Sequence, residues 1–164
     1  MSVSVPTRVG TAGTADKLAL LFAEAERCSE LPEIQALALR VCKGAGSRAQ
    51  ACVEAIEAWA SQIDYRHEPK DRLRDPLQTA EAGGDCDDLT LLVGSLLMAL
   101  KIPFEPEIVA DDQCVAFHVR AVAGLPPHNP TIGYVIDPVL WTEREWNSRP
   151  TVPASRQTQW RGRS

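Results

Sequence analysis

Residues 83–92 read Gly83-Gly84-Asp85-Cys86-Asp87-Asp88-Leu89-Thr90-Leu91-Leu92, with a cysteine between two glycines and an apolar segment. The apolar residues that follow recur at intervals of three and four: Leu89, Leu92, Val93, Leu96, Leu97 and Leu100. This spacing predicts a helix buried along one side, with Cys86 at or just before its first turn. The free N–H groups and positive dipole end of a helix favour a thiolate, which makes Cys86 a candidate nucleophile.

The candidate base for this nucleophile is His118, one of three histidines in the chain. It lies in a segment with a regular alternation of apolar residues. Apolar residues alternate through residues 115–122 and predict a strand, with His118 on the face opposite Val119. Residues 133–138 predict the next strand, which ends at Asp137 before a proline. If these two strands pair, Asp137 lies beside His118 and fixes the tautomer of its ring.

The order Cys, His, Asp resembles the transglutaminase-like superfamily of papain-type cysteine enzymes over roughly residues 50–140. The matching blocks are Gly84-Asp85-Cys86-Asp87-Asp88, Phe117-His118-Val119 and Ile136-Asp137-Pro138. The first block, preceded by Asp75-Pro76-Leu77-Gln78-Thr79, is similar in particular to small transglutaminase-like proteins encoded in bacteriophage and prophage genomes. The resemblance implies that Cys86 is the nucleophile, that His118 is the general base and acid, and that Asp137 orients the imidazole.

Three aspartates flank the cysteine: Asp85, Asp87 and Asp88. Their negative charge opposes ionisation of Cys86 and would raise its pKa. The favoured interpretation is that the carboxylates cap the helix or pair with a nearby arginine, and turn toward solvent. The helix dipole and a protonated His118 would then prevail, and we expect a lowered thiol pKa.

The same carboxylates raise the question of a cofactor. No cofactor is required for the chemistry that the resemblance implies. Carboxylate oxygens suit calcium, however, and some similar bacterial cysteine proteases with an Asp-Cys-Glu-Asp core bind calcium beside the nucleophile. A calcium ion at Asp85, Asp87 and Asp88 is therefore the alternative.

The site also needs donors for an oxyanion. The backbone N–H of Cys86 is one candidate donor, and the side chain of Gln78 or, alternatively, Gln62 is the second.

The 164 residues, of which 45% are hydrophobic and 24% charged, are typical of one globular domain. We expect an α+β fold with a papain/transglutaminase-like core: N-terminal helices at about 16–28, 32–43 and 48–63, a polar loop at 64–85, the central cysteine helix, and a small antiparallel sheet. The strand before His118 is expected at 107–110. Residues 1–15 are predicted to be flexible, 16–146 to form the domain, and 147–164 to form a disordered tail.

The distribution of charged and apolar residues limits which binding partners are expected. The segment 147–164 carries four arginines and no acidic residue, whereas the whole chain has a formal net charge of −5. An acidic body makes nucleic acid an unlikely partner, although the basic tail could dock to an acidic one, such as another virion protein. No apolar run predicts a transmembrane segment or a signal peptide, so a cytoplasmic or virion-associated protein is expected. The five cysteines include no CxxC pair and favour reduced thiols.

These observations predict nucleophilic acyl chemistry on a peptide or other amide substrate. Hydrolysis is favoured over cross-linking, because water needs no second binding site. The alternative is a catalytically idle transglutaminase-like fold that serves as a virion structural or assembly component.

Overall fold

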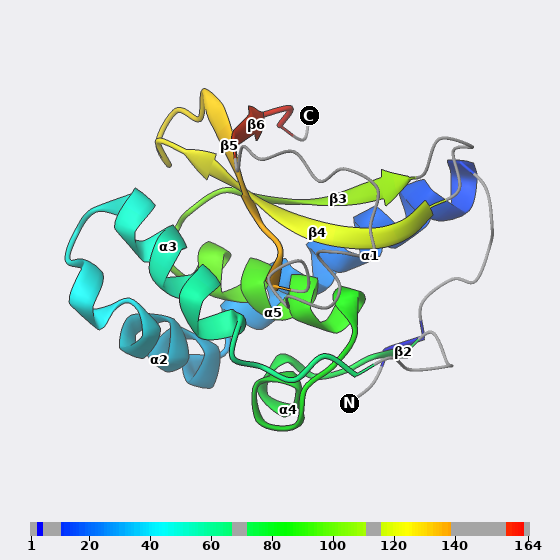
Figure 1. Cartoon of the computed structure of the whole chain (residues 1–164), viewed down its shortest axis with the longest axis horizontal. Helices are drawn as coiled ribbons and strands as arrows, with labels where there is room; N and C mark the ends of the chain where they lie inside the picture. Colours follow the sequence, from blue (N-terminus) through cyan, green and yellow to red (C-terminus); the bar gives the residue numbers. More distant parts are fainter. Residues whose placement is uncertain (1–2, 5–10, 67–71, 111–115, 139–156, 163–164) are drawn as a thin grey trace.

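The centre of the fold is an antiparallel sheet against which one buried helix packs (Figure 1). The computed structural model describes residues 3–4, 11–66, 72–110, 116–138 and 157–162. The sheet has the strand order β3-β4-β5-β6, formed by β3 (Phe104–Ala110), β4 (Ala116–Leu125), β5 (Ile132–Ile136) and β6 (Gln157–Gln159). The fold is therefore α+β with a small antiparallel sheet, as the sequence predicts.

The buried helix is α5 (Cys86–Ala99), and its sequence explains its central place. Eleven of its residues, from Asp87 to Leu97, are buried, so the helix is covered on nearly all sides. Such a helix belongs in the middle of a core rather than at its surface. Alternation along β4 turns Val119, Ala121 and Ala123 toward this core.

The predicted N-terminal helices are confirmed, with small differences at their ends. They are α1 (Thr11–Ser29), α2 (Pro32–Val41) and α3 (Ala49–Ala60), and they lie on the same side of the sheet as α5 (Figure 1). The second helix ends at Val41 rather than at 43, and a short 3-10 helix, η1 (Lys43–Ala45), follows it. Gly46, with φ of 64°, then turns the chain toward α3.

The prediction of a loop over residues 64–85 is wrong in part. This segment contains β2 (Arg72–Leu73) and a seven-residue helix, α4 (Pro76–Ala82). Asp75 caps α4 by accepting a hydrogen bond of 2.9 Å from the N–H of Leu77, and Pro76 occupies the first turn. A helix of two turns has too few apolar positions to show a period, which is why the pattern missed it.

Both predicted flexible ends contain ordered strands. At the N-terminus, β1 (Val3–Ser4) pairs with β2, and α1 begins at Thr11 rather than after residue 15. At the C-terminus, β6 pairs with β5, and the N–H of Arg161 donates a hydrogen bond of 3.3 Å to Glu105 on β3. The structure thus assigns a short strand within the tail for which the sequence predicts disorder, while 147–156 and 163–164 lie outside the described residues.

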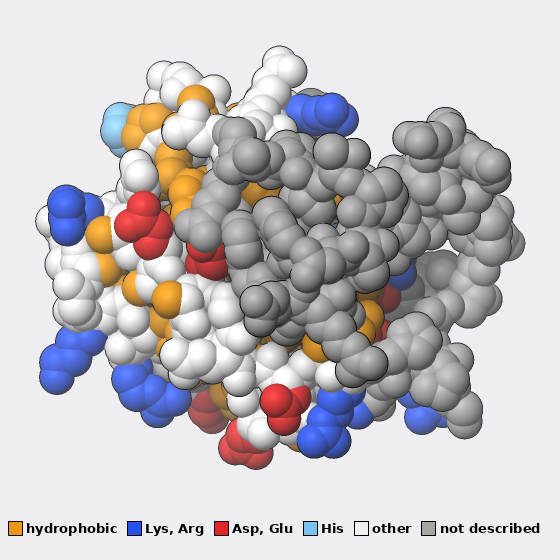
Figure 2. All heavy atoms as spheres, in the orientation of Figure 1, with side chains coloured by type: hydrophobic (Ala, Val, Ile, Leu, Met, Phe, Trp, Pro, Cys, Tyr) orange, Lys and Arg blue, Asp and Glu red, His pale blue; other side chains and the backbone are white. Residues whose placement is uncertain are grey.

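The described surface carries interspersed charges. Figure 2 shows Lys and Arg side chains alternating with Asp and Glu around the coloured part of this face, rather than gathered into one patch of a single sign. None of the helices in the described parts of the chain is long and apolar enough to cross a membrane.

Candidate active site

Pairing of β4 with β5 brings the predicted histidine and aspartate together. Ala121 lies opposite Ile136, so that Asp137, one residue beyond the end of β5, comes alongside the first half of β4. The Nε2 atom of His118 lies 2.7 Å from Oδ2 of Asp137, and both side chains are buried. The predicted His118–Asp137 contact is confirmed, and it fixes the orientation of the ring.

Burial makes this pair chemically distinct from a surface contact. The side chains are only 2% and 1% exposed, and the second oxygen of Asp137, Oδ1, has no hydrogen-bond partner among the described residues. A buried carboxylate in this setting is costly unless an adjacent group compensates its charge. The contact with the His118 ring offsets part of that cost.

Cys86 is the first residue of α5, as predicted, and it is half-buried. The backbone of Val119, the residue that follows His118, interacts with the thiol and acts to lower its pKa. The thiol donates a hydrogen bond of 3.9 Å to Oδ1 of Asp87. The cysteine and the histidine are thus brought to the same part of β4, but a Cys86–His118 hydrogen bond is not among the contacts of the described residues.

The three flanking aspartates divide into two groups by function. Asp85 and Asp88 form a capping box: Oδ1 of Asp85 accepts the N–H of Asp88 at 3.1 Å, and Oδ2 of Asp88 accepts the N–H of Asp85 at 3.1 Å. Asp88 also accepts the N–H of Arg74 at 2.7 Å. Asp87 instead forms an ion pair of 2.7 Å with Lys17 of α1. The predicted capping role is confirmed, with Lys17 as a partner that the sequence did not suggest.

The expectation of a lowered thiol pKa is wrong for this structure. Burial, followed by the charge of Asp87, raises the pKa of Cys86 to about 12. The N–H of Val119 and the charge of Lys17 act in the opposite direction but do not prevail. The first physical reason is that the thiol itself is buried, and the second is that Asp87 is buried beside the sulfur rather than turned toward solvent, so its charge is poorly screened.

The described residues contain no group of three or more His, Cys, Asp or Glu side chains placed to hold a metal ion. The two capping aspartates, Asp85 and Asp88, direct oxygens to backbone N–H groups, and Asp87 contacts an ammonium group. Their arrangement is that of a helix start.

The two glutamines proposed as oxyanion donors are both exposed, Gln78 on α4 and Gln62 in the turn after α3. The structure adds one backbone group to those expected near the sulfur, that of Val119, which acts to lower the thiol pKa. No sequence signal marks a backbone group of this kind, because its place depends on how α5 packs on β4.

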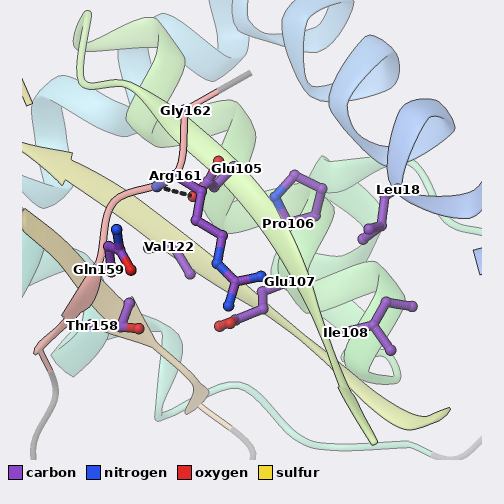
Figure 3. A pocket seen from close by; sticks show the side chains of 10 residues that line it. All are labelled: Leu18, Glu105, Pro106, Glu107, Ile108, Val122, Thr158, Gln159, Arg161 and Gly162. Atoms are coloured by element: carbon purple, nitrogen blue, oxygen red, sulfur yellow. Dashed lines mark hydrogen bonds between the residues drawn. The ribbon is translucent and has the colours of Figure 1, made fainter. Parts of the chain in front are cut away.

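A separate cavity of about 520 Å³ opens between α1, β3 and the C-terminal segment (Figure 3). Apolar side chains such as Leu18 and Val122 line it together with Glu105, Glu107 and Arg161. Neither the thiol nor the His118–Asp137 pair is among its lining residues. The cavity is therefore distinct from the candidate site.

Strand register places Glu105 and Glu107, two of the residues that line the cavity, on the face of the sheet that His118 shares, whereas Pro106 and Ile108 line it from the other face of β3. Val109 lies opposite His118, and two residues back along β3 Glu107 lies opposite Arg120, with which it forms an ion pair of 2.9 Å. Directly opposed residues share a face, and alternate residues on one strand do so too.

Comparison with known proteins adds nothing to this geometry: no protein-family model, curated protein or solved structure matches the chain.

Proposed function

We propose that this chain carries out cysteine-nucleophile acyl chemistry on peptide or amide bonds, on a core of the papain/transglutaminase type. The observation that supports the proposal is the buried His118–Asp137 pair, 2.7 Å apart, in a chain that also places a cysteine at the start of a buried helix. A nucleophile, a base and a group that orients the base are the parts that such chemistry needs.

Each residue has a defined step in the proposed reaction. His118 takes the thiol proton of Cys86 through Nδ1, because Asp137 holds Nε2. The thiolate attacks the carbonyl carbon, and the imidazolium then protonates the leaving amine. Water, deprotonated by the same ring, hydrolyses the resulting thioester and releases the acid. The backbone N–H of Cys86, in the first turn of α5, is the proposed donor to the oxyanion.

Hydrolysis is proposed over cross-linking, because the second step needs only water. The proposed substrates are peptides or proteins, and the proposed setting is a bacteriophage. The second candidate function is a catalytically idle fold within a virion. The observation that favours it is the raised pKa of Cys86, since a neutral thiol is a weak nucleophile. One experiment separates the two functions.

The experiment measures acyl transfer from p-nitrophenyl acetate at pH 8, because this ester needs no knowledge of the natural substrate. We expect a burst of p-nitrophenol and an acetyl group on Cys86, located by mass spectrometry of peptides. His118→Gln should reduce the burst rate by about 10²-fold or more, as is usual on loss of a general base. Asp137→Asn should reduce it less, since the amide still contacts the ring.

Cys28→Ser provides the matched control, because Cys28 is also buried in a helix but lies outside the site. Its burst should equal that of the unmodified chain. Circular dichroism must show that each variant is folded. Acetylation of Cys86 that is no faster than that of Cys28, or that does not change in His118→Gln, would establish the idle fold.

A further inference from the structure

A short chain of contacts links the N-terminal helix to the proposed nucleophile. Oδ2 of Asp87 lies 2.7 Å from Nζ of Lys17, and Oδ1 of the same carboxylate lies 3.9 Å from the sulfur of Cys86. The Asp87 side chain is 7% exposed, and that of Lys17 is 25% exposed. One buried carboxylate therefore bridges an ammonium group on α1 and a thiol on α5.

This bridge is separate from the helix cap. Asp85 and Asp88 already supply both halves of the capping box, so the start of α5 does not need the Asp87 carboxylate. A buried carboxylate that is not needed for capping is costly, and Lys17 offsets that cost only while it stays in contact. The ion pair with Lys17 on α1 therefore fixes the side chain of Asp87 in one rotamer.

We propose that Asp87 is a positioning residue, which accepts the S–H of Cys86 and holds the resting thiol protonated, and that Lys17 keeps Asp87 in that place. The role of this contact in catalysis rests on the proposed acyl chemistry. To react, the thiol must exchange its contact with Asp87 for one with Nδ1 of His118, and its proton then passes to the ring.

Other charged and polar groups of the described residues also act on the thiol of Cys86. Asp85 adds negative charge from α5, and the backbone of Val119 interacts with the thiol from β4, where His118 is the neighbouring ionisable group. Lys17 is the cation from α1. Of the acidic groups, Asp87 is the one in contact with the sulfur, so its removal should have the larger effect.

The test is the rate at which iodoacetamide alkylates Cys86 as a function of pH, in the full chain, measured by mass spectrometry. Asp87→Asn keeps the shape of the side chain and removes its charge. We expect the midpoint of the rate profile to fall by about one pH unit or more, and alkylation at pH 8 to become about tenfold faster. Glu81→Gln, an exposed carboxylate on α4, is the matched control and should leave the profile unchanged.

A double-mutant cycle tests the part played by Lys17. Lys17→Met should move the midpoint in the unmodified chain and should have a different effect in the Asp87→Asn background, where only the direct charge of Lys17 on the thiol remains. Lys17→Arg should restore the original midpoint. An unchanged profile in Asp87→Asn overturns the inference, and equal effects of Lys17→Met in both backgrounds overturn the role of Lys17.

These outcomes are distinguishable from a failure of the proposed function. If the fold is catalytically idle, Asp87→Asn still shifts the alkylation profile, while His118→Gln leaves acetylation unchanged. If the positioning role is wrong but the enzyme is active, the ester burst depends on His118, and Asp87→Asn leaves the alkylation profile as it was.

Discussion

Asp88 is fully buried in the first turn of α5, and opposing forces act on its carboxyl group. Burial raises the pKa of Asp88 to about 6, although the N–H groups of Arg74 and Asp85 favour the ionised form. The pKa in the folded chain is therefore above the unfolded value of about 3.9. A raised pKa means that the folded state binds this proton more tightly, so the stabilisation is complete below about pH 4 and is lost as the pH rises to 6.

We predict the consequence for unfolding in urea. The free energy of unfolding of the unmodified chain, minus that of Asp88→Asn, should fall by about 1–3 kcal/mol between pH 4 and pH 6.5. Asparagine does not titrate, so the variant removes this one contribution. A difference that grows with pH would show that the hydrogen bonds outweigh burial, and that the folded pKa is depressed.

The close packing of α5 against β3 depends on Gly94. A Cβ atom at this position would lie 2.5 Å from the ring of Phe104, which stacks in turn on Phe22 of α1 at a centroid distance of 6.4 Å. The ring is held between two elements and has little freedom to move away. The glycine is thus required by the approach of a strand to a helix.

We predict that Gly94→Ala lowers the free energy of unfolding by about 1–3 kcal/mol, the usual cost of overpacking a core. Gly44→Ala is the matched control, because a Cβ at Gly44 meets no atom within 4 Å. Its effect should stay within about 0.5 kcal/mol, as for other surface changes. Urea unfolding of the two variants measures both. Equal stabilities would mean that the packing around Phe104 relaxes freely.

The elements differ in how well their sequences predict them. The long helices α1, α3 and α5 each span several turns, so their apolar period or their caps identify them. The short elements α4 and β6 carry no such period. The strand β6, for example, has exposed and half-buried side chains and is ordered by its ladder with β5. Its composition alone predicts disorder.

At the scale of the whole molecule, the C-terminal segment closes one edge of the sheet. Residues 132–134 of β5 pair with β6, and the segment then reaches the opposite edge strand at Glu105 (Figure 3). The segment contributes backbone hydrogen bonds and little buried apolar surface. Its contribution to stability should therefore be small but measurable.

We predict that a chain ending at residue 156 still folds, with a helical circular dichroism spectrum close to that of the full chain. The free energy of unfolding should fall by about 1–3 kcal/mol, the net value of a few hydrogen bonds. Urea unfolding of the two chains checks this. An unchanged midpoint would support the disordered tail that the sequence suggested, and loss of the folded state would show that β5 depends on β6.

The sequence by itself determined the features that local chemistry controls. The apolar period sets α5, the aspartate before Cys86 caps it, and the alternation around His118 sets β4. The contact with Asp137 follows as well, because two strands that are adjacent in the chain pair in antiparallel fashion, and this register requires little further information.

Only the tertiary structure decided the state of the thiol. Lys17 and Asp87 are 70 residues apart in sequence, and no local pattern couples them. An aspartate beside Cys86 raises the thiol pKa in either case, but it raises it more when it is buried than when it faces water, since a buried charge is weakly screened. Burial arises from the packing of α1, α5 and β4 together, which is a property of the whole chain and not of residues 83–92.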